Sequence, residues 1–360
     1  SYNNNTRNFK YNEIHEVIFK SKKLSKYSLN NFKLFNEGNL IISDIKGNLI
    51  IFSIYENKII SKYNFYKNRF KKIEKNLNYI VENDLIFVAD NLGYFYAYNY
   101  KINKIIWAKN YKVPFSSNIK IYKNNIIVSN QNNNLFFISK KNGELIKLIP
   151  TEEIFLKNDF FNNLSVDNDN LFFLNTFGSL YSVNLKTLSI NWFNNFNKSI
   201  DLLPSNLFIG NKIVTTDKEI IISSNTNTFI INKNSGSIIK KYNFSTKIKP
   251  IVVNNLIIFL TKNNFLLTLD SNTKKIIYSF NLNEYDKSIS NVSQNNIYKE
   301  IMILNDEIYI FLNNSKILNF YINGKFKQKI KINSKIGSNP ISIESSIYFL
   351  DKTNKLVIFN

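Results

Sequence analysis

The sequence predicts an all-β fold, an eight-bladed β-propeller. Three observations support this prediction: a repeat, a turn signature inside it, and chain ends that complement each other. A segment made of two apolar runs joined by a turn recurs eight times, at separations of 36 to 52 residues. Periods of about 40 to 50 residues built from short strands are typical of propeller blades. Gapless copies of the segment begin at Leu40, Ile86, Ile126, Leu171, Ile220, Leu256, Ile308 and Ile347.

The turn inside each copy has a constant chemistry. Its opening position is held by Asp44, Asp90, Asn130, Asn175, Ser224, Leu260, Leu312 and Asp351. Three residues later stand Gly47, Gly93, Asn133, Gly178, Asn227, Asn263, Ser315 and Asn354. Gly and Asn adopt positive φ at low steric cost, so this pattern indicates a hairpin. An apolar residue returns two positions further on, which defines the buried face of the strand: Leu49, Phe95, Leu135, Leu180, Phe229, Phe265, Ile317 and Leu356.

Each repeat also has room for two more strands. One apolar run precedes each copy, and another follows a second turn near Asn57, Asn103, Gly143, Gly236 and Gly324. We therefore expect blades of four antiparallel strands, and a ring of eight such blades leaves only short, protected sheet edges.

The chain ends at Asn360, directly after the second strand of the last copy, so that blade lacks its outer strands. We expect part of the segment Glu13–Leu29 to complete it and so to close the ring; the alternative is an unattached N-terminal arm. Residues 1–12 are expected to form a polar tether, and residues 13–360 a single propeller domain.

The formal net charge is +21, which by itself suggests a nucleic-acid partner. Lys supplies nearly all of this charge, because Arg occurs only at Arg7 and Arg69. Scarce Arg and Ala beside abundant Asn, Lys and Ile indicate a genome poor in G and C. Recognition of bases and phosphates usually depends on the planar fork of Arg. We therefore predict no nucleic-acid partner.

No combination of residues assembles into a convincing active site. Cys is absent, which excludes disulfides, thiolate catalysis and Cys-ligated metals. The single His, His15, lies outside the repeats, so a Ser-His-Asp triad or a His-rich metal site cannot be built. We expect His15 to be a partly exposed strand or loop residue.

The carboxylates are few and lie mostly in turns. Asp44, Asp90 and Asp351 share the position that opens the hairpin, and we interpret them as acceptors of backbone N–H bonds rather than a ring of ligands. Asp167 and Asp169 lie in an Asn-rich turn that resembles a calcium loop, but the Gly and the distal Glu of that loop are missing. We predict no catalytic, cofactor-binding or metal-binding residue.

The repeat resembles the pyrroloquinoline-quinone-type propeller repeat. The second copy is the most similar one, with Val88-Ala-Asp90-Asn-Leu-Gly93-Tyr-Phe95-Tyr-Ala97 followed by Asn103-Lys-Ile-Ile-Trp107. The fourth copy ends in the same way at Trp192. The resemblance implies that Trp107 and Trp192 are structural docking residues between blades. Other copies hold Ser61, Lys147 or Lys240 at this position.

Two functional classes share this repeat. Quinone-dependent dehydrogenases are generally longer and need a calcium site and a catalytic Asp, and many also have adjacent Cys residues. The chain is more similar to the BamB outer-membrane assembly lipoprotein family, whose members are non-catalytic eight-bladed propellers of about this size. This resemblance implies a cofactor-free scaffold at the periplasmic face of the outer membrane. It would aid β-barrel assembly by contacting a barrel-assembly subunit and nascent β-barrel proteins. A quinone-dependent periplasmic oxidoreductase and a propeller interaction protein of another pathway remain the alternatives.

The segment Ser199–Ser205 resembles the loop by which BamB-type proteins contact their barrel partner. The resemblance assigns partner binding to Ile200, Asp201, Leu202 and Leu203, although Leu203 replaces the Arg of the family. The alternative is an ordinary inner strand that enters the fifth blade. The polar start of the chain suits a tether behind a lipidated Cys, which would anchor the protein to the membrane if a Cys preceded Ser1.

Overall fold

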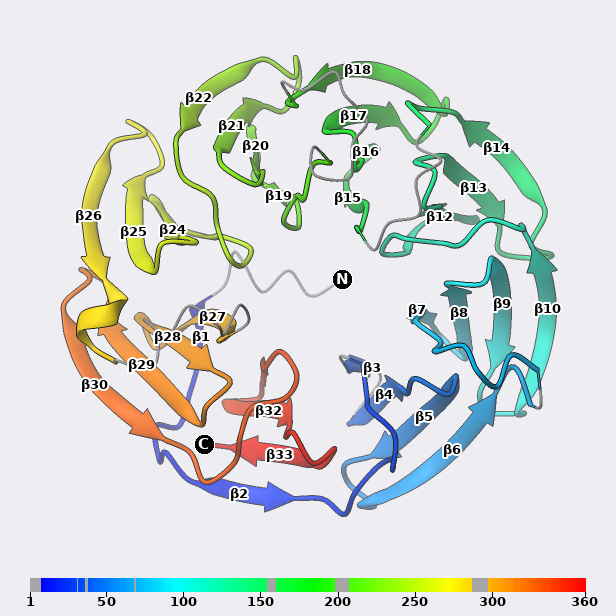
Figure 1. Ribbon diagram of the computed structural model, residues 1–360, viewed down its shortest axis with the longest axis horizontal. Helices are drawn as coiled ribbons and strands as arrows, with labels where there is room; N and C mark the ends of the chain where they lie inside the picture. Colours follow the sequence, from blue (N-terminus) through cyan, green and yellow to red (C-terminus); the bar gives the residue numbers. More distant parts are fainter. Residues whose placement is uncertain are drawn as a thin grey trace. The chain divides into compact units, whose positions relative to one another are not determined.

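The computed structural model describes residues 8–30, 32–35, 38–67, 69–153, 160–197, 207–286 and 297–360. Within these ranges the chain is almost entirely β-structure, arranged in eight sheets (Figure 1). The predicted fold class is confirmed: the chain is an eight-bladed β-propeller of four-stranded antiparallel blades. No helix in the described part of the chain is long and apolar enough to cross a membrane.

The described strands and one 3-10 helix follow one another in this order: β1 (Asn8–Phe9), β2 (Val17–Lys20), β3 (Lys33–Phe35), β4 (Asn39–Ser43), β5 (Asn48–Ser53), β6 (Lys58–Asn64), β7 (Leu77–Glu82), β8 (Leu85–Asp90), β9 (Tyr94–Asn99), β10 (Lys104–Asn110), β11 (Lys120–Tyr122), β12 (Asn125–Ser129), β13 (Leu135–Ser139), β14 (Leu145–Ile149), β15 (Asn163–Asp167), β16 (Asn170–Leu174), β17 (Ser179–Asn184), β18 (Ser189–Asn195), β19 (Val214–Thr215), β20 (Glu219–Ser223), β21 (Thr228–Asn232), β22 (Ile238–Tyr242), β23 (Ile251–Val253), β24 (Leu256–Leu260), β25 (Phe265–Asp270), β26 (Ile276–Asn281), η2 (Leu282–Glu284), β27 (Tyr298–Leu304), β28 (Glu307–Leu312), β29 (Lys316–Tyr321), β30 (Phe326–Lys331), β31 (Ile341–Ile343), β32 (Ser346–Leu350) and β33 (Leu356–Phe359).

The chain divides into two compact units. Unit 1 comprises Ser1–Ser43, Ile50–Ile60 and Phe244–Asn360, and unit 2 comprises Asp44–Leu49 and Ser61–Asn243. Unit 2 contains the four sheets from β7 to β22, and unit 1 contains the sheets built from β23 to β33 together with β1 and β2. The sheet β3-β4-β5-β6 contributes residues to both units. That residues 13–360 form a single domain stays a prediction.

The hairpin signature is confirmed in six of the eight copies, where φ is positive at Gly47, Gly93, Asn133, Gly178, Ser315 and Asn354. Asn227 does not have positive φ, and in the sixth copy the positive φ lies one residue later than predicted, at Asn264.

The prediction for the sixth copy is wrong by one residue because the side chain of Thr261, not Leu260, opens the turn. Thr261 Oγ1 accepts a hydrogen bond from the backbone N–H of Phe265 at 3.0 Å. As a result Leu266 is fully buried, and Phe265, which we expected to be buried, is 37% exposed.

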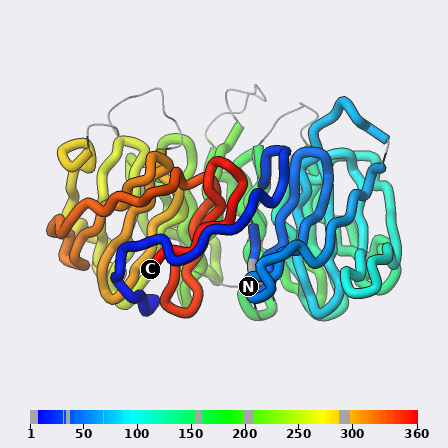
Figure 2. The backbone as a smooth tube through the Cα atoms, turned by 90° about the horizontal axis from the view of Figure 1, so that it is seen from below, coloured from blue at the N-terminus to red at the C-terminus, as the bar shows by residue number. Residues whose placement is uncertain are grey.

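The N-terminal segment completes the last blade, as predicted. β2 pairs antiparallel with β33, so the order of this sheet is β2-β33-β32-β31. In Figure 2 the N-terminal segment (blue) and the C-terminal segment (red) run side by side. Glu16 and Asn360 exchange two backbone hydrogen bonds of 2.8 and 3.0 Å beyond the ladder. Lys20 Nζ lies 2.9 Å from Asp351 Oδ2, and the Asp351 side chain is only 4% exposed.

The same segment also contacts a second blade of unit 1. β1 lies parallel beside β27 and makes this sheet five-stranded. We had expected residues 8–12 to belong to a polar tether, but Tyr11 is buried at 6% exposure. Its ring centroid lies 5.5 Å from that of Tyr309 and 6.3 Å from that of Phe359. Burial of this large ring favours the ordered position over a free arm.

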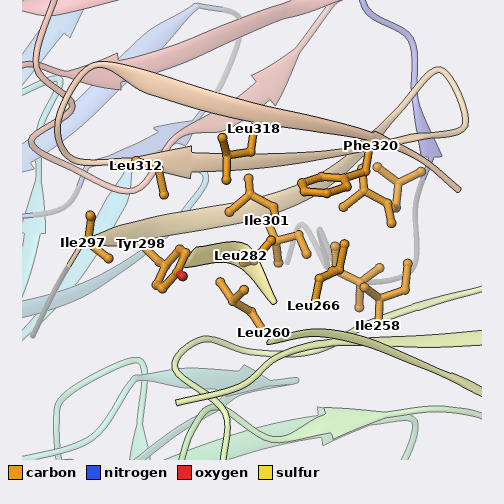
Figure 3. Close-up of a cluster of buried hydrophobic side chains, with 14 of the residues drawn as sticks. Ile258, Leu260, Leu266, Leu282, Ile297, Tyr298, Ile301, Leu312, Leu318 and Phe320 are labelled. Carbon is orange, nitrogen blue, oxygen red and sulfur yellow. The ribbon is translucent and has the colours of Figure 1, made fainter. Parts of the chain in front are cut away.

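The apolar core of unit 1 lies between the faces of neighbouring blades. In Figure 3, Ile258 and Leu266 point from the sheet β23–β26 toward Ile301 and Leu318 of the sheet β27–β30. Leu282 from the helix η2 completes the cluster and is fully buried. Alternating apolar residues on each strand therefore hold adjacent blades together face to face.

We expect Asp351→Asn to lower the free energy of unfolding by about 1 to 2 kcal/mol at neutral pH. Burial raises the pKa of Asp351, but hydrogen bonds from Thr353 and Lys20 outweigh it and hold the pKa below its ordinary value. The carboxylate therefore stabilises the fold above its unfolded pKa of about 4, and this contribution disappears as the pH falls through the folded-state pKa.

Urea unfolding of wild type and variant between about pH 2 and pH 7 measures this difference. Lys23→Gln, an exposed change on the same segment, serves as control and leaves the curve unchanged. An equal loss at both ends of the pH range would contradict the prediction.

Candidate functional site

The recurring polar residues at the start of the hairpin turns are turn caps. Asp90 Oδ1 accepts hydrogen bonds from the backbone N–H groups of Leu92 and Tyr94, each at 2.8 Å. The N–H groups two and four positions later donate in the same way to Asp44, Asn130, Asn175 and Asp351. The interpretation of these carboxylates as acceptors of backbone N–H bonds is confirmed.

Asp90 has the most unusual electrostatic setting of these caps. Its side chain is fully buried, and its second carboxylate oxygen accepts a hydrogen bond from the Tyr66 hydroxyl. Burial raises the pKa of Asp90, and the hydrogen bonds from Tyr66 and the turn offset this only in part. Burial and the charge of Asp90 also raise the pKa of Tyr66. Both side chains are buried, so the carboxylate is not exposed at the surface.

The two carboxylates of the Asn-rich turn are engaged by lysines. Asp167 Oδ2 lies 2.7 Å from Lys233 Nζ, and Asp169 Oδ2 lies 2.5 Å from Lys186 Nζ. Asp169 also accepts a hydrogen bond from the Tyr122 hydroxyl. Among the residues that the structure describes, no group of three or more His, Asp or Glu side chains could hold a metal ion.

His15 lies in a loop with positive φ and is partly exposed, as expected. Its Nε2 lies 3.3 Å from Nε2 of Gln328, and its ring stacks near Phe359 at 6.4 Å between centroids. Burial is the main cause that holds the pKa of His15 below its ordinary value. These contacts belong to the N-terminal segment that completes the last blade.

Trp107 and Trp192 each reach from an outermost strand to a turn of the following sheet in unit 2. Trp107 Nε1 donates to the backbone oxygen of Lys140 at 2.9 Å, and Trp192 Nε1 donates to that of Lys233 at 3.2 Å. The indoles lie against Gly143 and Gly236, where a Cβ would clash with the ring. We propose that this contact sets the spacing between blades.

A third residue makes the same contact, and the sequence analysis missed it. Tyr278 of β26 donates its hydroxyl to the backbone oxygen of Ile322 at 2.8 Å, and its ring lies against Gly324. The signal is present in the sequence, because Lys275-Ile-Ile-Tyr278 parallels Lys104-Ile-Ile-Trp107.

The outermost strands share a second feature, a one-residue β-bulge. The register between the outer strand and its neighbour shifts by one residue in β2, β10, β14, β18, β22, β26 and β30. The skipped residue is an exposed isoleucine in five of these strands, namely Ile18, Ile106, Ile146, Ile239 and Ile277. Bulges and edge lysines both discourage the addition of a further strand. The exposed edges of the outermost strands are therefore poorly suited to pair with a further strand.

The partner-binding residues proposed from the sequence, Ile200, Asp201, Leu202 and Leu203, lie outside the described residues. They follow β18, which is the outermost strand of its sheet, and precede β19, the first strand of the next sheet. β18 and β26 contain no charged residue, unlike the other outer strands, which all contain Lys: β2, β6, β10, β14, β22 and β30.

No family model and no curated protein matches this chain. Among solved structures, BamB from Moraxella catarrhalis is similar with a TM-score of 0.72 and 9% identity, over 94% of this chain and 99% of that one. Quinohemoprotein alcohol dehydrogenase from Comamonas testosteroni is similar with a TM-score of 0.71 and 9% identity, over 99% of this chain and 78% of that one. The computationally designed protein Ika8 is similar with a TM-score of 0.68 and 6% identity, over 96% of this chain and 99% of that one. The chain therefore has the same overall fold as these proteins and is similar to BamB in architecture.

We expect the pH dependence of stability to change in the opposite direction in Asp90→Asn and in Asp351→Asn. The raised pKa means that wild type loses stability as the pH rises from the unfolded pKa through the folded-state pKa. The variant has no charge to bury, and Asn already serves as the cap at Asn130 and Asn175. The free energy of unfolding of the variant relative to wild type should rise as the pH increases above the unfolded pKa of about 4, as measured by urea unfolding. A relative stability that falls over this range would refute the assignment.

We expect Trp107→Ala to lower the free energy of unfolding by about 2 to 4 kcal/mol, because it removes a buried ring and a hydrogen bond. Lys147→Ala, at the equivalent position of the next blade, is the matched control and should cost less than about 0.5 kcal/mol. Denaturant unfolding monitored by circular dichroism compares them. Equal losses in the two variants would show that the docking contact has no special role.

Proposed function

We propose that this chain is a non-catalytic propeller scaffold that aids the assembly of β-barrel proteins into the outer membrane through protein–protein contacts. The observation that supports this proposal is the end-to-end likeness to BamB, of which 99% is covered, against 78% of the quinohemoprotein alcohol dehydrogenase. The BamB family, which the repeat resembles, acts at the periplasmic face of the outer membrane. We propose the same location here, with a lipid anchor if a Cys precedes Ser1.

The architecture favours loops over edges as the contact surface. The outer strands carry bulges, and most of them carry lysines, so a nascent strand is not readily added to them. Loops between blades are held at their ends by rigid sheets and are free to vary in sequence. We propose that the loop containing Ile200, Asp201, Leu202 and Leu203 contacts a subunit of the barrel-assembly machinery, with Ile200 and Leu202 as apolar anchors.

A site-specific photo-crosslinker at position 200 or 202 tests this proposal in native membranes. We expect a crosslink to a barrel-assembly subunit from both positions and none from position 240, an exposed control site on β22. Leu202→Asp should abolish the adduct formed from position 200, whereas Lys240→Asp should leave it unchanged. Equal adducts from the loop and from position 240 would count against the loop as the contact.

The second candidate function is that of a quinone-dependent periplasmic oxidoreductase, which the likeness to the quinohemoprotein alcohol dehydrogenase favours. An activity assay distinguishes the scaffold from the oxidoreductase. The purified chain is incubated with pyrroloquinoline quinone, calcium and an alcohol, and a redox dye serves as the electron acceptor. The scaffold proposal expects no dye reduction above that of the free cofactor. Saturable alcohol-dependent reduction would replace it with the oxidoreductase.

A further inference from the structure

The loop of residues 65–76, which joins β6 to β7 in unit 2, collects positive charge at its surface. Four of its described side chains are exposed cations, namely Lys67, Arg69, Lys71 and Lys72. Within the described part of the chain none of the four has an ion-pair partner, and Glu74 is the one carboxylate of the loop. Arg is scarce in this sequence, and Arg69 is one of only two. The loop therefore carries a surplus of unpaired positive charge.

Two large apolar side chains stand among these cations. Phe70 is 39% exposed and Ile73 is 44% exposed. They are the two ends of one tight turn, because the backbone N–H of Ile73 donates to the backbone oxygen of Phe70 at 3.1 Å. Lys71 and Lys72 occupy the two positions between them. We call Lys67 and residues 69–73 together the basic tip, and it presents apolar and cationic groups to water side by side.

Buried groups hold the basic tip in place. Lys75 is buried, its backbone N–H donates to the backbone oxygen of Ile45 at 2.9 Å, and its Nζ donates to the backbone oxygen of Phe70. The backbone oxygen of Tyr66, a buried residue, accepts from the N–H of Arg69 at 2.8 Å. The Phe70 ring lies edge-on to the Tyr66 ring, with 6.5 Å between centroids. The exposed side chains are therefore displayed on an ordered base.

The backbone of the tip is strained at Phe70. Its φ is 55°, and among the described residues no other Phe, Tyr or Trp has positive φ. A bulky side chain is uncommon in this region because its Cβ crowds the following carbonyl. The hairpin turns of this chain place Gly47 or Asn133 at such positions, which relieves the crowding. A ring retained at a strained and exposed position indicates that the ring itself is used.

This combination of groups fits the surface of a bilayer that contains anionic lipids. Cations close to such a surface are attracted by its negative potential, and apolar side chains gain further by entering the headgroup region. A stable protein interface buries about 800 Å² on each partner, which is more than one tip offers. A fluid bilayer, in contrast, can take up an isolated projecting loop.

We propose that the basic tip docks on an anionic bilayer surface, with Phe70 and Ile73 inserted among the headgroups and Arg69, Lys71 and Lys72 at the lipid phosphates. This inference does not rest on a role in barrel assembly. A vesicle assay contains no assembly subunit, and crosslinking from positions 200 and 202 does not report on the tip, so each proposal can fail without the other.

Flotation of the purified full chain with lipid vesicles tests the charge of the tip. We expect binding to vesicles of phosphatidylglycerol and phosphatidylcholine in equal parts, and little binding to phosphatidylcholine alone. Lys71→Gln/Lys72→Gln should lower the affinity at least about tenfold. Lys240→Gln/Lys241→Gln removes the same charge from two adjacent exposed positions of the same unit and should bind as wild type does. Equal losses in the two variants, or equal binding to both kinds of vesicle, would overturn the proposal.

The same assay tests the apolar part of the tip. Phe70→Ser/Ile73→Ser should also weaken binding to the mixed vesicles at least about tenfold. The matched control is Ile238→Ser/Ile239→Ser, which changes two exposed isoleucines of β22 and should have no effect. If the control variant loses as much affinity as the tip variant, the tip has no special role in binding.

A fluorescent label gives a readout of insertion that leaves the charges of the tip unchanged. Because the chain contains no Cys, Ile73→Cys creates a single site for an environment-sensitive dye. We expect the emission of the dye at position 73 to increase and shift to the blue on the mixed vesicles, and the emission of the dye at Ile239→Cys to stay unchanged. Vesicle binding without a change at position 73 would place the tip outside the lipid, reject the proposal and leave an acidic protein as the partner of this surface.

Discussion

The backbone pairing of β2 with β33 is the constraint on which the order of unit 1 depends. Without it, β33 would present a full row of unpaired N–H and C=O groups at the end of the chain. The ladder is reinforced by Lys20 and Asp351, which is itself the cap of the preceding turn. The same carboxylate therefore holds the hairpin β32–β33 and the strand that covers it. Turn geometry and blade completion are coupled through one buried charge.

The N-terminal segment does more than complete one sheet. Between β1 and β2 it buries Tyr11 against Tyr309 of one blade and Phe359 of the next. Asn305 fastens it by exchanging hydrogen bonds of 2.7 and 2.9 Å with the backbone of Tyr11. A segment that is polar at its start thus joins two blades, because a single large ring supplies enough apolar contact to order the residues around it.

Most of the fold could be predicted from the sequence because turns and strand alternation are local. The failures are equally local. Leu260 and Thr261 compete for the start of one turn, and only the hydrogen-bonding capacity of Thr261 decides the register. The docking role of Tyr278 was not predicted because the repeat pattern has Trp at this position. The Tyr278 hydroxyl nevertheless donates to a backbone carbonyl of the next blade, as the Trp indoles do. Contacts between distant segments, such as the hydrogen bond from Asn163 to the backbone oxygen of Gly210, leave no periodic trace in the sequence.

Positive and negative side chains occupy different places in the blades. On the outer strands, lysines accompany bulges, and hydrated ammonium groups there keep edges apart. Many carboxylates cap turns or form ion pairs with nearby lysines, as Asp167 does with Lys233.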